Sequence, residues 1–261
     1  MTDPTQLRGY RLRGDDREQA LAWLQVHADV RGVLEESDAL WVWLDGELPR
    51  LPPLRDLAVE PRGCEPGDLM HTGREHDAPI HVAPDLLVRP PWVARPADFT
   101  GIELVVPRGG AFGSGEHGST QAALRCLHAV WPEPTPASCA DVGTGSGILA
   151  LYAFVRGVAR IGACDVDAAA VAAAAELLPH ALVRCGGPAV LPPAELVVAN
   201  LTAAELHGCL IEVWALWARR APLVVSGLRA GEVAPLLAVV PAAELHRETV
   251  GAFTSIAFRS R

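Results

Sequence analysis

The sequence predicts an α/β protein whose main part is a Rossmann-like sheet of seven strands, mostly parallel and ending in an antiparallel C-terminal hairpin. From about residue 93 onward, short apolar runs alternate with helical segments, the pattern of a parallel sheet covered by helices. One run leads into the glycine-rich residues 141–147 (DVGTGSG), as in nucleotide-binding α/β units. At 261 residues the chain is long enough for this domain and a small second one.

The first 60 residues predict a small α+β domain. A helix is expected around the apolar side chains Ala20, Leu21, Leu24 and Ala28. Strands are expected at residues 9–13, 33–36, 40–44 and 57–61. Residues 61–92 hold six prolines among scattered charges, which indicates a linker and edge region. The large domain is therefore expected to cover residues 93–261.

Strands and helices are expected to alternate along the large domain. Apolar runs predict strands at residues 102–107, 160–165, 181–185, 195–199 and 222–226, and a closing hairpin at residues 244–250 and 253–260. Helices are expected at residues 120–130, 148–155 and 167–178, and after residue 200, where Leu206, Leu210, Val213 and Trp217 form an apolar stripe.

The glycine-rich segment predicts a binding site for S-adenosylmethionine. Because glycine has no Cβ, Gly143, Gly145 and Gly147 let the main chain turn tightly against a ligand, and the helix that starts there is expected to aim free N–H groups at it. Asp165 ends the next expected strand, where nucleotide-binding units place the carboxylate that accepts the ribose hydroxyls. A dinucleotide site would need a glycine at Ile148, so this spacing with a leading Asp141 is typical of methyltransferases. The alternative is a structural glycine turn with a capping aspartate.

Asn200 is the predicted catalytic residue, and it also belongs to the predicted cofactor site. It is the only asparagine in a chain with 22 arginines and no lysine, and it ends an apolar run, where open α/β sheets bind ligands. A capping box at Thr202 and Glu205 would leave Asn200 free to face the site, although asparagine is also a common turn residue. Methyltransferases that act on planar nitrogens typically carry (D/N)PP(Y/F) here, whereas this chain reads NLTA, which favours an aliphatic amine.

The composition of the chain limits the kinds of partner, cofactor and cellular location that we expect. A net charge of −9 argues against direct binding of nucleic acid and favours a basic protein substrate. The six cysteines form no CxxC pair, so neither zinc nor a disulfide framework is expected. The start of the sequence lacks the apolar region of a signal peptide, and no apolar run reaches the ~18 residues of a membrane span. We expect a cytoplasmic monomer without membrane association.

Three blocks of the large domain resemble the PrmA family, the methyltransferases of large-subunit ribosomal protein eleven. Residues 111–120 (AFGSGEHGST) resemble the family's AFGTGxHxTT loop, residues 141–150 its D-x-G-x-G-S-G-I-L-A segment, and residues 197–206 (VVANLTAAEL) its VVANI/L-x-A segment. By this resemblance Thr120, Gly143, Asp165 and Asn200 contact the cofactor. The family's tryptophans in the linker and near the C-terminus have no counterpart in residues 68–77 or 250–258, and only Pro91-Trp92 remains.

The resemblance implies an S-adenosylmethionine-dependent enzyme that methylates lysine side chains, and an N-terminal amine, of that ribosomal protein. Residues 1–60 contain none of the chemical motifs, so we expect them to dock the protein substrate. Residues 112–119 are expected to form a mobile lid with Phe112 and His117 nearest the acceptor, although His117 packing within the loop is the alternative. Two other functions remain open. One is an enzyme of the same cofactor class acting on another protein or a small amine, which the missing tryptophans favour; the other is a non-catalytic cofactor-binding protein.

Overall fold

The computed structural model describes residues 7–35, 38–62, 77–108 and 112–260, and the chain divides into two compact units, Met1–Asp77 and Ala78–Arg261. The first unit contains the strands β1 (Leu7–Arg13), β2 (Asp29–Glu35), β3 (Ala39–Asp45) and β4 (Ala58–Arg62) and the helix α1 (Arg17–His27). The strands form an antiparallel sheet in the order β2-β3-β1-β4. Tyr10, Leu12, Leu24, Val42 and Leu44 form its core. The strands and the helix predicted for this segment are present.

The prediction of a linker is wrong for residues 80–89, which form two strands. β5 (Ile80–Ala83) and β6 (Leu86–Arg89) pair antiparallel, and β6 pairs parallel with β7 (Ile102–Val105), so β7 belongs to this separate three-stranded sheet and not to the main one. The prolines at 79, 84 and 90 flank the strands rather than interrupt them, while Leu86, Leu87 and Val88 are fully buried. Residues 63–76 of the predicted linker lie outside the described residues.

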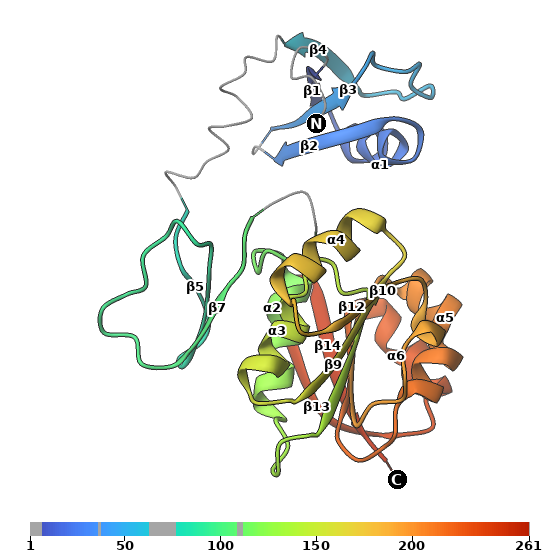
Figure 1. Ribbon diagram of the computed structural model, residues 1–261. Helices are drawn as coiled ribbons and strands as arrows, with labels where there is room; N and C mark the ends of the chain where they lie inside the picture. The colour runs from blue at the N-terminus through green and yellow to red at the C-terminus, as the bar shows by residue number, and fades with distance from the viewer. Residues whose placement is uncertain (1–6, 36–37, 63–76, 109–111, 261) are drawn as a thin grey trace. The chain divides into compact units, whose positions relative to one another are not determined.

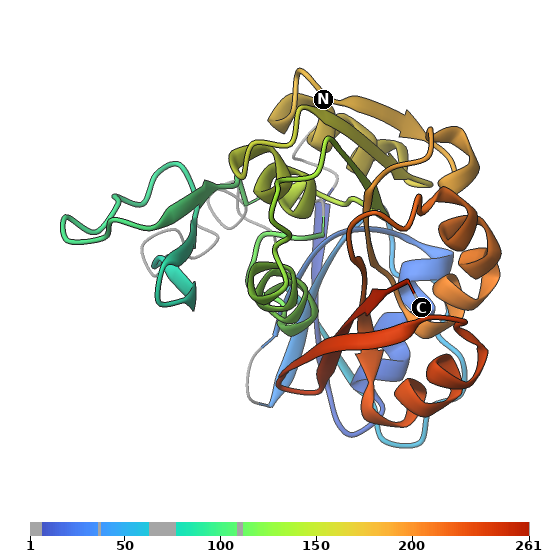
Figure 2. The same ribbon diagram turned by 90° about the horizontal axis from the view of Figure 1, so that it is seen from below.

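The second unit contains the predicted seven-stranded sheet, in the order β10-β9-β8-β11-β12-β14-β13. The strands are β8 (Ser138–Val142), β9 (Arg160–Asp165), β10 (Leu182–Cys185), β11 (Leu196–Asn200), β12 (Leu223–Arg229), β13 (Ala243–Val250) and β14 (Phe253–Arg259). Strands β8 to β12 pair parallel, and β14 pairs antiparallel with both β12 and β13. The hairpin of β13 and β14, coloured red in Figure 2, therefore forms one end of the sheet. This confirms the predicted mixed topology.

Helices cover both faces of this sheet (Figure 1). They are α2 (Gly118–Ala129), α3 (Ile148–Val155), α4 (Ala168–Leu177), α5 (Ala203–Leu216) and α6 (Ala230–Val239), with a short 3-10 turn at Pro188–Val190. One core lies under α2 and α3 and extends to the β5–β7 sheet, and a second lies under α5 and α6. Helix α6 was not predicted, because Gly231 and Pro235 weaken its helical pattern. Within the described segments, no helix is both long and apolar enough to span a bilayer.

Candidate functional site

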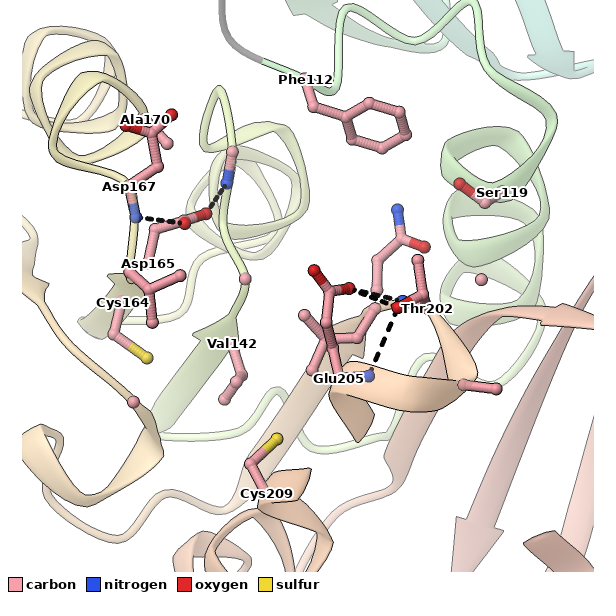
Figure 3. A pocket seen from close by; sticks show the side chains of 18 of the residues that line it. Phe112, Ser119, Val142, Cys164, Asp165, Asp167, Ala170, Thr202, Glu205 and Cys209 are labelled. Atoms are coloured by element: carbon pink, nitrogen blue, oxygen red, sulfur yellow. Dashed lines mark hydrogen bonds between the residues drawn. The ribbon is translucent and has the colours of Figure 1, made fainter. Parts of the chain in front are cut away.

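A pocket of about 690 Å³ opens at the carboxyl ends of β8, β9, β11 and β12. This is the edge at which open α/β sheets bind ligands, and the volume is ordinary for a small-molecule site. The start of α2, the segment before it and the first residue of β14 also contribute to its wall, together with residues of α4, α5 and α6 and of the segment after β10. In Figure 3, Asp165 and Asp167 lie on one side, Phe112 and Ser119 on the other, and Thr202 and Glu205 between them.

Asp165 lies in the pocket wall, as predicted, and it also holds two loops together. Its Oδ2 accepts the Gly145 N–H at 2.9 Å, and its Oδ1 accepts the Asp167 N–H at 3.0 Å (Figure 3). Each carboxylate oxygen has a second lone pair. The same side chain can therefore fix the glycine loop and accept two hydroxyls from a ligand.

The glycines are required for close packing between protein segments. Gly143, Gly145 and Gly147 all have positive φ, at 68°, 54° and 90°. A Cβ at Gly143 would lie 2.3 Å from Leu201 Cδ2, and one at Gly145 would lie 2.3 Å from the Phe112 carbonyl oxygen. A side chain at Gly145 would therefore clash with main-chain atoms, and one at Gly143 would have to displace Leu201 and adopt a strained positive φ.

The expected free N–H groups belong to the helix that follows the glycine turn, and the main-chain N–H groups of the turn itself, residues 143–147, are bonded within the protein. The Gly143 and Thr144 amides donate to the Cys164 carbonyl oxygen at 2.9 and 3.0 Å, and the Ser146 amide donates to the Phe112 carbonyl oxygen at 2.7 Å. Gly147 donates to the Thr144 carbonyl oxygen at 2.8 Å, and Gly145 donates to Asp165. Protein acceptors therefore use all five amides.

Three of the predicted cofactor residues do not line the pocket: Thr120, Asp141 and Gly147. Asp141 is fully buried, where its Oδ2 accepts the Thr144 hydroxyl at 2.8 Å and the Ala150 N–H at 3.1 Å. This burial raises the pKa of Asp141 to about 6. Thr120 is also fully buried, and its neighbour Ser119 lines the pocket instead. The geometry does not support direct ligand contacts from these three residues.

Asn200 ends β11 half-buried in the pocket wall, as predicted. The predicted capping box is present: the Glu205 N–H donates to Thr202 Oγ1 at 3.3 Å, and the Thr202 N–H donates to Glu205 Oε2 at 2.8 Å. The side-chain amide of Asn200 makes no hydrogen bond to any residue that the structure describes. Gly227 lets the main chain that follows Asn200 pass close to β12, because a Cβ at Gly227 would lie 2.2 Å from the Leu201 carbonyl oxygen. The amide is left available to a ligand.

His117 both lines the pocket and packs within the loop as a helix cap. Its ring lines the pocket, and it is also the N-cap of α2, because Nδ1 accepts the Ser119 N–H at 3.3 Å. Burial lowers the pKa of His117 below its usual 6.5. Nδ1 acts as an acceptor, so the proton of the neutral ring is on Nε2.

Two hydrogen bonds connect the predicted lid, residues 112–119, to the glycine loop. Besides the bond from the Ser146 amide to the Phe112 carbonyl oxygen, the Ser146 hydroxyl donates to the Gly113 carbonyl oxygen at 2.7 Å. Phe112 lines the pocket and its side chain is 55% exposed. Ala111, which opens the motif, lies outside the described residues.

Sequence reasoning missed several lining residues that come from distant parts of the chain. They include Gly186, Gly187, Cys209, Arg229, Glu232 and Phe253. Carboxylates from Asp165, Asp167, Glu205 and Glu232 share the lining with the Arg229 guanidinium. The pocket therefore favours a cationic ligand or acceptor. A short Ser-Gly after the apolar run of β12 was the signal for Gly227, whereas Phe253 has no local signal.

A family model described as ribosomal protein L11 methyltransferase (PrmA) matches residues 65–234. The chain belongs to this family. Similar PrmA proteins include the ribosomal protein L11 methyltransferase of Synechococcus sp. (strain RCC307), 31% identical over 191 residues, which are 68% of this chain and 60% of the relative. Another is that of Trichlorobacter lovleyi, 34% identical over 137 residues, which are 51% of this chain and 43% of the relative. The chain spans about half the length of these relatives.

The fold agrees with a solved structure of the same family. The ribosomal protein L11 methylase from Lactobacillus delbrueckii subsp. bulgaricus superposes with a TM-score of 0.63 at 24% identity, over 70% of this chain and 99% of that one. Family and fold are those of S-adenosylmethionine-dependent methyltransferases. The resemblance and the cofactor predicted from the sequence are therefore confirmed.

Proposed function

We propose that this chain transfers methyl groups from S-adenosylmethionine to amines of large-subunit ribosomal protein eleven in the cytoplasm. The acceptors are lysine side chains and the N-terminal amine. The observation that carries the proposal is Asn200: a side-chain amide with no hydrogen-bond partner in the described structure, in the wall of a pocket that also contains Asp165. The substrate is inferred from the relatives, which are ribosomal protein L11 methyltransferases.

The residues of the pocket fit the cofactor. Asp165 offers two acceptor oxygens for the ribose, beside Gly143 and Gly145 at the ends of β8 and β9. Asn200 and Ser119 lie toward β11 and α2, where the reacting end belongs. The sulfonium of the bound donor supplies an activated methyl group, so the protein needs mainly to align a neutral nucleophile and exclude water.

Asn200 aligns the acceptor. Its amide oxygen accepts a hydrogen bond from the amine N–H, which directs the nitrogen lone pair at the methyl group. The carboxylates of Glu205 and Glu232 attract a lysine in its cationic form. The proton that the amine must lose before attack leaves to water at the pocket mouth. The residues after Asn200 lack the prolines and the aromatic typical of enzymes that act on planar nitrogens, which favours an aliphatic amine as the acceptor.

The first unit docks the protein substrate in this proposal. It has its own core but none of the pocket residues. Because docking raises the effective concentration of several amines at the active site, multiple methylation follows. Direct contact with nucleic acid is not part of the reaction.

The test is methylation in a ribosome-free lysate from a strain that lacks the enzyme, with labelled S-adenosylmethionine. The proposal expects one labelled band at the mass of a small basic ribosomal protein, absent when the added chain carries Asn200→Ala. A labelled band of another mass would favour a related enzyme with a different acceptor, as the missing tryptophans suggest. No label from a chain that binds the cofactor would leave only a cofactor-binding role.

A further inference from the structure

Three aromatic rings lie side by side on the acceptor side of the pocket: Phe112, His117 and Phe253, called the aromatic wall below. All three line the pocket. The ring centroids of Phe112 and His117 are 5.0 Å apart, edge to face, and those of His117 and Phe253 are 4.4 Å apart. They come from the segment before α2 and from the start of β14, so residues more than a hundred positions apart in the sequence meet here.

The fold fixes the position of Phe253. It is the first residue of β14, which pairs with β12 and β13 on its two sides. Gly118, at the start of α2, leaves room for it, because a Cβ there would lie 3.2 Å from Phe253 Cδ2 and 2.9 Å from the Val250 carbonyl oxygen. Two neighbours along β14, Thr254 and Ser255, are buried. The start of β14 therefore holds the ring against α2.

Asn200 alone cannot account for repeated methylation. Its amide oxygen needs an N–H from the acceptor, and each transfer removes one. A dimethylated or trimethylated ammonium instead carries its charge on methyl groups, which bind well to the faces of aromatic rings. His117 adds an uncharged ring, since burial lowers its pKa and Nδ1 accepts the bond from Ser119.

We propose that the aromatic wall binds the methylated ammonium of the acceptor, and that Phe253 thereby determines how many methyl groups are added. This inference rests on the proposed function. In each round an N–C bond forms as the C–S bond of the donor breaks, the sulfur keeps the electron pair as a neutral thioether, and the nitrogen releases one proton to water before the next transfer. The last round leaves a quaternary ammonium.

Binding tests the wall without any turnover. With S-adenosylhomocysteine present, calorimetry compares trimethyllysine with its uncharged carbon isostere on the full-length protein. We expect the wild-type protein to prefer the cation, and Phe253→Leu, which keeps an apolar side chain but removes the ring, to lose about fivefold in affinity for the cation only. Phe253→Tyr should restore the preference. Phe154→Leu, at an exposed aromatic of α3 outside the pocket, is the matched control and should change nothing.

Product analysis gives the second measurement. By intact mass, the ratio of monomethylated to trimethylated ribosomal protein should rise in Phe253→Leu relative to the wild-type protein. If this variant does not fold, Phe112→Leu serves instead, because Phe112 is an exposed residue of the wall.

Three results would overturn the inference. The first is equal wild-type affinity for the cation and the isostere, and the second is an equal loss for both in Phe253→Leu. The third is that Phe253→Leu binds S-adenosylmethionine more weakly but S-adenosylhomocysteine as well as the wild-type protein does. The aromatic wall would then bind the sulfonium of the donor and not the acceptor. A protein that prefers the cation yet labels no ribosomal protein would contradict the proposed function and not the wall.

Discussion

Replacement of Asp165 by alanine should weaken cofactor binding and the fold together, because this carboxylate has two tasks. Loss of charge-assisted hydrogen bonds to the ribose costs about 1.5–3 kcal/mol, which is roughly ten- to a hundredfold in affinity. The same change leaves the Gly145 and Asp167 amides without their acceptors at 2.9 and 3.0 Å. At about 1 kcal/mol each, this lowers the stability by about 2 kcal/mol and the melting temperature of the second unit by about 4–8 °C.

Calorimetry with S-adenosylmethionine and thermal unfolding measure the two losses on one protein. Asp167→Ala is the matched control, because Asp167 lines the same pocket but its Oδ1 caps α4 through the Ala169 N–H at 2.9 Å. It should cost stability of about 1 kcal/mol with a much smaller change in affinity. Unchanged affinity in a folded Asp165→Ala protein refutes the assignment. An equal loss of affinity in both variants would reduce the effect to the overall charge of the pocket.

The other predictions concern the acceptor, the two units and the buried acid. Asn200→Ala should reduce methyl transfer at least tenfold more than cofactor affinity, measured by steady-state kinetics and calorimetry, because alignment is lost at the reacting centre; equal losses would make Asn200 only a cofactor contact. A chain that begins at Ala78 should keep its cofactor affinity and lose nearly all transfer to the folded ribosomal protein; full-rate transfer by a soluble truncated chain would contradict docking. Burial raises the pKa of Asp141 from 3.8 to about 6, so the folded state binds the extra proton. The free energy of unfolding should therefore fall by up to about 3 kcal/mol from pH 4 to pH 6 and level off above it. In urea titrations Asp141→Asn should lose this dependence, and identical pH profiles for both proteins would show that Asp141 does not cause it.

The parts of the site that follow from local sequence were predictable. Asp165 and Asn200 each end an apolar strand, so the rule that ligands bind at the carboxyl ends of parallel strands was enough to place both in one pocket. The capping box at Thr202 was equally local, because its two partners are three residues apart.

The parts that depend on tertiary contacts were not predictable. The glycine loop has the spacing of a ligand-binding turn, yet its amides bond to Cys164 and Phe112, which only the fold brings near. Asp141 is in the motif but points into the core. Phe253 reaches the pocket through the hairpin and has no signal in its own neighbourhood. The number of prolines gave a wrong prediction for residues 80–89, because proline can flank a strand as easily as it can break one.

Ser146 connects the glycine loop to the segment before α2. Its main-chain N–H donates to the Phe112 carbonyl oxygen, and its hydroxyl donates to the Gly113 carbonyl oxygen. Both acceptors are main-chain atoms, but the contact leaves no room for added side chains: a Cβ at Gly113 would lie 2.9 Å from Ser146 Oγ, and one at Gly145 would lie 2.3 Å from the Phe112 carbonyl oxygen. Substitutions in the two segments should therefore not be independent. A double-mutant cycle between Ser146 and Gly113 would show an interaction energy, whereas the same cycle between Ser146 and a distant surface residue would be additive. A substitution in either segment is therefore tolerated only when the glycine loop and the segment before α2 can still pack against each other.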